Sequence, residues 1–414
     1  MATSELLNVD VRQGERKNAN STICYRRAPV VACAATMERT AMTTATRAPF
    51  IYIGAYTDPA MHGKAVGISV YHMDPSSGAL THVRTVADVV NPSFLAIAPS
   101  QRSLYAVNET ERHDGLPGGG ASAFALDADA GRLTPLNQQP THGTLPAYLT
   151  IDPSGRYLLV ANYGSGNVAV YPIGEGGILD AMSDLVRTTG SGPNTARQAG
   201  PHAHMITFDP SNRFALLVNL GIDKTLVYRL DTATGKLHAH DIVTDDGVTE
   251  QSCGQAAPGA GPRHIAFHPT NRYAYVINEL SSTIDAFAWD ATRGTLAHRQ
   301  TISLRPANFT GTSSGAEIVV HPSGRFLYGS VREYNGIAIF DIDAASGKLT
   351  ALGHEATQGE NPRSITLDPL GVFLLVANQD SDNVVTFRID QSTGALTATG
   401  AIAHTPSPVC LLFI

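Results

Sequence analysis

Six ionisable side chains interrupt an otherwise regular pattern in this sequence: Glu109, His204, Arg263, Glu279, Arg332 and Arg363. An imidazole that titrates near neutral pH can move a proton, and guanidinium groups can stabilise an oxyanion or bind an anion. A carboxylate can orient either kind of group. Brought together, such a set would suit chemistry at a carbonyl. The chain must therefore contain elements that gather residues this far apart in the sequence.

Those elements come from an internal repeat that runs from Pro49 to the end of the chain. β-branched and aromatic residues fill short apolar runs, and Gly and Pro bound them, which predicts strands. A proline-centred turn separates two such runs within residues 152–162 and recurs at Pro99, Pro210, Pro269, Pro322 and Pro369. A Gly-x-Leu turn recurs seven times, 46 to 59 residues apart, beginning at Gly78, Gly131, Gly177, Gly235, Gly294, Gly347 and Gly394.

Four predicted strands in each of seven units predict an all-β fold, a seven-bladed β-propeller over residues 49–414. Residues 408–414 have the pattern of a first strand without a successor, whereas residues 50 to about 86 supply strands two to four. Pairing of the N- and C-terminal strands in one blade would close the ring and remove two sheet edges. An open repeat array is the alternative, but complementary ends favour the ring.

In a propeller the first strand of each blade is innermost, and its start lies on the same face as the end of the second strand. We therefore compared equivalent positions in the repeat. The starts of the first strands are Ser93, Ala147, His204, Arg263, Ala316, Arg363 and Val409. The ends of the second strands are Glu109, Tyr163, Leu220, Glu279, Arg332 and Gln379, with Ala55 or Tyr56 in the first unit. The charged members of both sets should converge on one channel mouth.

Ionisable groups gathered in a cavity are candidates for a functional site. The alternative is that these charges solvate a water-filled pore and pair with one another. His202 and His204 share a strand face and could bind a metal as a pair, but no carboxylate-rich third-ligand motif is close in the sequence. We therefore expect no metal and a single functional histidine with His202 beside it. We interpret His264, His268 and His321 as structural.

Composition excludes several classes of protein. Lys plus Arg is 29 against 36 Asp plus Glu, a formal net charge of −7, which argues against a non-specific nucleic-acid binder. The low charged fraction of 16% and the 38 glycines argue against a coiled coil. The sequence has no run of 18 apolar residues, so we expect no membrane-spanning helix. It also has no nucleotide-binding loop, and we expect no cofactor.

Residues 1–48 lack the repeat, and we expect a disordered tail or an over-extended translation start, with Met37 or Met42 as the true one. A short apolar stretch behind Arg26–Arg27 leaves export as an alternative to a cytoplasmic location. The four cysteines, Cys24, Cys33, Cys253 and Cys410, form no CxxC pair, so free thiols in a reducing compartment are expected.

The same residues carry a resemblance to a known family. The segment Gly261-Pro262-Arg263-His264-Ile265-Ala266-Phe267-His268-Pro269 and the later Asn278-Glu279-Leu280 resemble motifs of the lactonase-type seven-bladed propellers. This family includes bacterial 6-phosphogluconolactonases and fungal carboxy-cis,cis-muconate cyclases. Residues 306–310, 316–328 and 361–364 match as well, and the resemblance covers residues 48 to 414. One departure is Val331, since the family often has Asn before the arginine at this position.

The resemblance implies hydrolysis of a sugar lactone, foremost 6-phospho-D-glucono-1,5-lactone, with His204, Arg263, Glu279 and Arg332 as catalytic residues. His204 is the candidate base and Glu279 would orient it or the water, although these two roles could be exchanged. Arg263 and Arg332 would stabilise the oxyanion, and Arg363 would bind a substrate phosphate. His202, Glu109 and Glu317 complete the expected substrate-binding set.

Two other functions stay open from the sequence. One is a lactonase or cycloisomerase acting on another lactone, such as a carboxymuconolactone. The other is a non-catalytic propeller scaffold, which would place its distinctive residues on blade rims rather than in the channel. The expected partner is a small lactone, and the expected state is a monomer or weak oligomer.

Overall fold

The computed structural model describes residues 49–113, 115–244 and 248–414. The predicted tail of residues 1–48, with its alternative starts and possible export signal, lies outside the described residues. In the described part of the chain, no helix has the length and hydropathy that a bilayer crossing requires.

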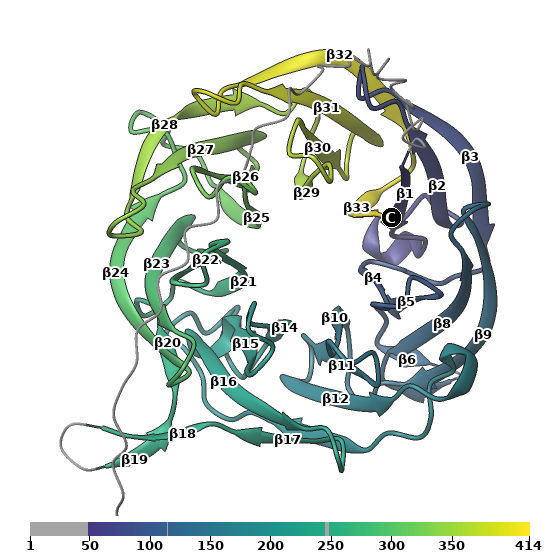
Figure 1. Cartoon of the computed structure of the whole chain (residues 1–414), viewed down its shortest axis with the longest axis vertical. Helices are drawn as coiled ribbons and strands as arrows, with labels where there is room; N and C mark the ends of the chain where they lie inside the picture. The colour runs from purple at the N-terminus through teal and green to yellow at the C-terminus, as the bar shows by residue number, and fades with distance from the viewer. Residues whose placement is uncertain (1–48, 114, 245–247) are drawn as a thin grey trace, which may run out of the picture. The chain divides into compact units, whose positions relative to one another are not determined.

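Within the described residues, seven sheets of four antiparallel strands follow one another around a ring (Figure 1), so the predicted seven-bladed propeller is confirmed. Blades 1 to 7 are named here in chain order, each from its innermost strand outward. Blade 1 contains β33 (Pro408–Phe413), β1 (Phe50–Ala55), β2 (Gly67–Met73) and β3 (Leu80–Ala87). Blade 2 contains β4 (Leu95–Ile97), β5 (Ser103–Asn108), β8 (Gly120–Asp127) and β9 (Arg132–Pro140). Blade 3 contains β10 (Pro146–Ile151), β11 (Tyr157–Asn162), β12 (Asn167–Pro172) and β13 (Asp184–Arg187).

Blade 4 contains β14 (Ala203–Phe208), β15 (Ala215–Asn219), β16 (Lys224–Asp231) and β17 (Lys236–Ala239), and β20 (Cys253–Gln255) also pairs with β16. Blade 5 contains β21 (Pro262–Phe267), β22 (Tyr273–Asn278), β23 (Thr283–Asp290) and β24 (Thr295–Ser303). Blade 6 contains β25 (Ser314–Val320), β26 (Phe326–Arg332), β27 (Gly336–Ile342) and β28 (Leu349–Ala356). Blade 7 contains β29 (Pro362–Leu367), β30 (Phe373–Asn378), β31 (Asn383–Ile389) and β32 (Leu396–His404).

Short elements lie outside this pattern. Two hairpins pair β6 (Arg112–His113) with β7 (Leu116–Pro117), and β18 (Asp241–Val243) with β19 (Thr249–Gln251). The short 3₁₀ helices are η1 (Pro59–Met61), η2 (Glu175–Gly177) and η3 (Leu220–Ile222).

The ring closes as predicted, because the C-terminal strand β33 pairs with β1 in an antiparallel register. Ile53 lies opposite Leu411 and Gly54 opposite Cys410. Blade 1 is therefore assembled from the first and last strands of the propeller. The pairing of β1 with β33 satisfies the hydrogen-bonding edge of each strand.

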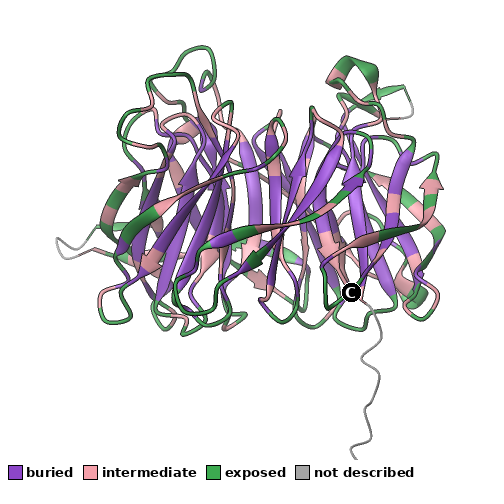
Figure 2. Ribbon diagram, turned by 90° about the horizontal axis from the view of Figure 1, so that it is seen from above, coloured by how far each residue is buried: buried purple, intermediate pink, exposed green. Residues whose placement is uncertain are grey.

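The core lies between neighbouring blades. Inner and middle strands are apolar on both faces because each blade packs on two others, and β11, β22 and β30 are buried along their whole length. One cluster joins Tyr275 and Ile277 of blade 5 to Leu327 and Val331 of blade 6. The outermost strands alternate between exposed and half-buried residues, as Figure 2 shows in green and pink around the buried purple strands.

Two steric requirements explain why the Gly-x-Leu turn always has glycine at this position. Gly347 has φ +72°, a left-handed conformation that L side chains rarely adopt. A Cβ there would also lie 2.3 Å from the ring of Tyr273 in the preceding blade. The repeat seen in the sequence therefore marks where each outer turn contacts its neighbour.

Shortening Leu411 in the closing strand should destabilise the whole ring. Leu411 is 7% exposed, and Leu411→Ala should lower the free energy of unfolding by about 2–5 kcal/mol through a lost apolar contact and a cavity. Leu352→Ala, at a residue of β28 that is 49% exposed, should change it by less than about 0.5 kcal/mol. Denaturant or thermal unfolding measures both, and equal effects in the two variants would contradict the role given to β33.

Candidate active site

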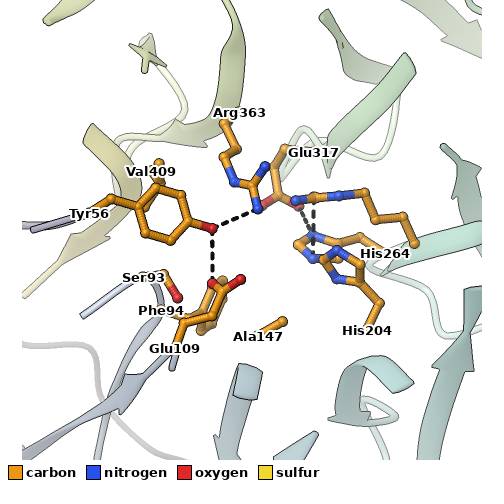
Figure 3. Close-up of a pocket in the computed structure, with 11 residues that line it drawn as sticks. Tyr56, Ser93, Phe94, Glu109, Ala147, His204, His264, Glu317, Arg363 and Val409 are labelled. Atoms are coloured by element: carbon orange, nitrogen blue, oxygen red, sulfur yellow. Dashed lines mark hydrogen bonds and ion pairs between the residues drawn. The ribbon is translucent and has the colours of Figure 1, made fainter. Parts of the chain in front are cut away.

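A small cavity lies where the innermost strands begin (Figure 3). Its lining includes the strand-start residue that the repeat predicts in six of the seven blades, and in blade 6 it includes Glu317 instead of the predicted Ala316. The lining residues are Tyr56, Ser93, Phe94, Glu109, Ala147, His204, Arg263, His264, Glu317, Arg363 and Val409. Side chains from positions spread over the whole ring thus meet in one place.

A β-bulge at the start of the innermost strand aims these side chains. In β21 the register against β22 shifts between Pro262 and His264, so Arg263 has no partner of its own. The same irregularity isolates His204 in β14 and Arg363 in β29, and in β25 it falls between Gly315 and Ile318. A bulge interrupts the alternation of side chains, which lets neighbours such as Arg263 and His264 both line the cavity.

The structure brings together five of the predicted site residues in the cavity wall: Glu109, His204, Arg263, Glu317 and Arg363. The other three lie around it. Glu279 and Arg332 form ion pairs beside Arg263. His202 stacks on Tyr163, with ring centroids 4.6 Å apart, and its Nδ1 donates to the Tyr163 carbonyl. Tyr163 in turn meets the edge of His204, so His202 contacts the site through another residue.

The Glu279 carboxylate forms ion pairs with three arginines. It does not pair with His204, and it is not one of the residues that line the cavity. Its carboxylate pairs with Arg197 at 2.5 Å, Arg332 at 3.1 Å and Arg263 Nε at 3.2 Å, the last without the alignment of a hydrogen bond. Burial alone would raise the pKa of Glu279, but Arg332, Arg263 and Arg197 together lower it to about 2. A carboxylate so stabilised is a poor proton acceptor, and its role is to position and neutralise the guanidinium groups.

His204 is buried among positive charges. Burial, followed by the charges of Arg263, His264 and Arg363, holds its pKa well below the ordinary value of 6.5. Its Nδ1 is buried without a hydrogen-bond partner among the described residues. The expected carboxylate partner, Glu279, is occupied elsewhere. His204 is therefore a neutral imidazole with an unused polar atom at the cavity.

A chain of hydrogen bonds crosses the cavity from Arg363 to Glu109. Arg363 Nη2 donates to Tyr56 Oη at 2.8 Å, and the Tyr56 hydroxyl donates to Glu109 Oε2 at 2.9 Å. Burial lowers the pKa of Arg363, but Tyr56, Glu109 and Glu279 more than offset this and raise it. The bond to Tyr56 uses one of the five guanidinium N–H donors, so Arg363 keeps donors for an anion.

His264, which the sequence analysis interprets as structural, lies in the cavity wall. Its Nδ1 donates to Glu317 Oε1 at 2.7 Å, and its ring lines the cavity beside that of His204. Strict strand alternation places a residue next to Arg263 on the opposite face, and the bulge removes that restriction. His268 and His321, in contrast, do act structurally, since each Nε2 donates to a glycine carbonyl of the next blade at 2.8 Å.

Two further residues escape analysis of the repeat. Tyr56 was one of two alternatives in the first unit, because β1 begins the chain's repeat without a preceding turn. Arg197 comes from the long segment between β13 and β14, which contains no strand of the repeat. Its Nη2 donates to both Glu279 and the Tyr163 hydroxyl, so it ties blade 3 to blade 5 at the mouth. The glycine- and proline-rich residues 190–201 were the signal that this segment differs.

Among the described residues, no group of three or more His, Cys, Asp or Glu side chains is arranged to hold a metal ion. The cavity instead combines two guanidinium groups, two imidazoles and two carboxylates. This arrangement can bind an anionic or polyhydroxylated molecule, stabilise an oxyanion and transfer a proton.

Removing the charge of Glu279 should destabilise the fold in a pH-dependent way. At neutral pH, Glu279→Gln leaves three guanidinium groups without their carboxylate and should cost about 3–5 kcal/mol. The folded pKa of about 2 lies below the ordinary 4.5, so the carboxylate stabilises above pH 4.5 and loses this contribution as the pH falls towards 2.

The difference in unfolding free energy between wild type and Glu279→Gln should therefore shrink on acidification. Denaturant unfolding between pH 7 and the lowest pH that the fold tolerates measures this. Glu333→Gln, at an exposed residue of the same mouth, is the control and should be near neutral at every pH. A pH-independent cost for Glu279→Gln would contradict the three-arginine arrangement.

Comparisons with known proteins agree with the fold. A family model described as "Lactonase, 7-bladed beta-propeller" matches residues 50–413. A 6-phosphogluconolactonase of Bacillus subtilis is 37% identical over 313 residues, 75% of this chain and 83% of that protein. One of Formosa agariphila is 34% identical over 320 residues, 77% and 86% of the two chains. The solved structure of a periplasmic gluconolactonase of Pseudomonas aeruginosa, 32% identical, has a TM-score of 0.79 and covers 88% of this chain and 99% of that one. The chain belongs to the lactonase family of seven-bladed β-propellers.

Proposed function

We propose that this protein hydrolyses 6-phospho-D-glucono-1,5-lactone to 6-phosphogluconate in the cytoplasm. The observation that carries the proposal is the gathering of Arg263, Arg363 and two imidazoles in one cavity. The relatives from Bacillus subtilis and Formosa agariphila, both named 6-phosphogluconolactonase, support the choice of substrate. The compartment stays a prediction, because residues 1–48 lie outside the described residues.

The cavity supplies the groups that hydrolysis of a cyclic ester requires. Water must attack the lactone carbonyl, and the negative charge that develops on its oxygen must be stabilised. Burial, Arg363 and Arg332 lower the pKa of Arg263 to about 10, so its guanidinium stays cationic at neutral pH and can hold the oxyanion. His204 offers the lactone or the water a neutral hydrogen-bonding partner.

Arg363 is the proposed phosphate ligand. A guanidinium group binds phosphate through two parallel hydrogen bonds, and Tyr56 fixes its plane from one side. The ring of Tyr56 also lies 5.3 Å from the Arg363 carbon Cζ, which restricts the side chain further. Glu109 and Glu317 can accept hydrogen bonds from sugar hydroxyls.

A second candidate substrate is an unphosphorylated lactone. The relative from Pseudomonas aeruginosa is named a gluconolactonase. The cavity contains the carboxylates Glu109 and Glu317 beside its two arginines. Carboxylates accept hydrogen bonds from sugar hydroxyl groups, whereas they repel the negative charge of a substrate phosphate.

The substrate assay uses 6-phosphogluconolactone and gluconolactone, freshly generated, with spontaneous hydrolysis subtracted. We expect a higher kcat/KM for the phosphorylated lactone. Arg363→Met should raise its KM roughly 10- to 100-fold through loss of charge-assisted hydrogen bonds and should affect the unphosphorylated lactone much less. Arg388→Met, at an exposed arginine of β31, is the matched control.

Turnover of gluconolactone alone would favour the second candidate, and no acceleration of either lactone would overturn the proposed function. An equal effect of Arg363→Met on both substrates would remove the phosphate role from Arg363 while leaving the lactonase proposal intact.

Arg263 should act mainly on the chemical step. Arg263→Gln removes the cation that faces the oxyanion, and kcat should fall about 10²- to 10³-fold with a smaller change in KM. Steady-state kinetics measures this split, and near-ultraviolet circular dichroism checks the fold. A variant with unchanged kcat would exclude Arg263 from oxyanion stabilisation.

A further inference from the structure

We infer that His264 and Glu317 form the proton-transfer dyad of this cavity, with His264 Nε2 taking the proton from the attacking water. The inference rests on the proposed lactone hydrolysis. It assigns His264 as a catalytic residue and Glu317 as the residue that positions it.

The dyad is built from two neighbouring blades. His264 lies in β21 of blade 5, directly after the bulge, and Glu317 lies in the bulge of β25 of blade 6. Their Nδ1 and Oε1 atoms are 2.7 Å apart, and the two side chains are 4% and 15% exposed. The Glu317 oxygen also accepts the backbone N–H of Ile318, and Ser330 Oγ accepts the N–H of Glu317. The carboxylate is thus held in one orientation before any substrate arrives.

This contact fixes which nitrogen of the imidazole is basic. An ionised carboxylate accepts hydrogen bonds and donates none, so His264 Nδ1 carries the hydrogen and Nε2 keeps the lone pair. Nε2 accepts a long hydrogen bond of 3.4 Å from Nη1 of Arg263, so the proton acceptor lies beside the group that stabilises the oxyanion. The attacking water must replace this contact at Nε2 before it can give up its proton. A single water and a lactone carbonyl need both within hydrogen-bond reach.

The ring itself cannot turn freely. Tyr148 contacts its edge with centroids 5.3 Å apart, and Tyr148 stacks on Phe94 at 3.8 Å. The ring of His204 lies at 5.0 Å on another side. Aromatic neighbours therefore pack around the imidazole ring, and its Nε2 faces the cavity and Arg263.

The charged groups near His264 and His204 differ, and this difference favours His264 as the proton acceptor. Arg263 and Arg363 face both imidazoles, and burial lowers the pKa of each. Glu317 opposes this effect for His264, whereas the main charges that act on His204 among the described residues are those of Arg263, His264 and Arg363. An imidazolium at His264 is compensated directly, and one at His204 would add a further positive charge beside two arginines. His204 is then left to hydrogen-bond the lactone.

Hydrolysis through the dyad consists of the addition of water and the collapse of the tetrahedral intermediate. A water oxygen lone pair forms a bond to the carbonyl carbon as His264 Nε2 takes one water proton, and the carbonyl π electrons move to the oxygen next to Arg263. Collapse of this tetrahedral intermediate re-forms the carbonyl and breaks the bond to the ring oxygen. That oxygen takes the proton from His264 Nε2, which yields the open-chain hydroxy acid and the neutral imidazole.

The kinetic test compares four variants on the lactone that the wild type hydrolyses fastest. His264→Gln should lower kcat about 10²- to 10⁴-fold with little change in KM, as expected for loss of a general base. Glu317→Gln keeps the shape but not the charge and should lower kcat roughly 10- to 100-fold. His268→Gln, at an equally buried histidine of the same strand region that lies outside the cavity, should stay near the wild-type rate. His204→Gln should affect KM more than kcat.

Two measurements separate a catalytic from a structural effect. Added imidazole should restore part of the activity of His264→Gly and none of the activity of Arg263→Gln. Proton NMR should show a far-downfield Nδ1–H resonance that disappears in His264→Gln and moves upfield in Glu317→Gln, and this signal does not depend on turnover.

A folded His264→Gln variant with near-wild-type kcat overturns the inference while the lactonase proposal stands. The reverse pattern, with kcat lost in His204→Gln and kept in His264→Gln, does the same and returns the base to His204. A wild type that shows the downfield resonance but accelerates no lactone overturns the proposed function, and with it the catalytic role of the dyad.

Discussion

The pairing of β33 with β1 is the contact on which the cavity depends. It brings the first and last strands of the propeller together in blade 1 and so fixes the distance between blades 7 and 2. Arg363 and Tyr56 are 307 residues apart in the sequence, yet they share a hydrogen bond across this closure, and Tyr56 extends it to Glu109. Without the closure, the starts of the seven innermost strands would share no common centre.

Burying so many charges in one place is costly unless each has a partner, and the site meets this condition by pairing. Glu279 faces three guanidinium groups, Glu317 faces His264, and Glu109 receives the Tyr56 hydroxyl. The pairs span different blades, so the same contacts that neutralise the cavity also bind the blades together. The blades themselves contribute few charges to the core, in keeping with the charged fraction of 16%.

The sequence predicts the blade number, the closure and the wall positions because glycine and proline turns repeat with a steady spacing. Comparison of equivalent positions identifies Arg263 and Arg363 without any knowledge of tertiary structure. It misses His264, since a bulge is a local change of register that strict alternation cannot reveal. Arg197 is missed because its segment contains no strand of the repeat. The partner of Glu279 could not be predicted either, because Arg197, Arg263 and Arg332 meet it through side-chain conformation rather than through spacing.

The side chains that the bulges turn into the cavity are distributed unevenly around the ring of blades. Seven strand starts surround the cavity, but the ionisable side chains His204, Arg263 and Arg363 come from those of blades 4, 5 and 7, and blade 6 supplies Glu317 one residue later. Ser93 and Ala147 occupy the strand starts of blades 2 and 3. For the lactone that we propose, the short side chains of Ser93 and Ala147 leave more space for the body of the ring than the arginine and imidazole side chains on the opposite side. Side chains without a reactive group thus shape the cavity together with those that carry charge.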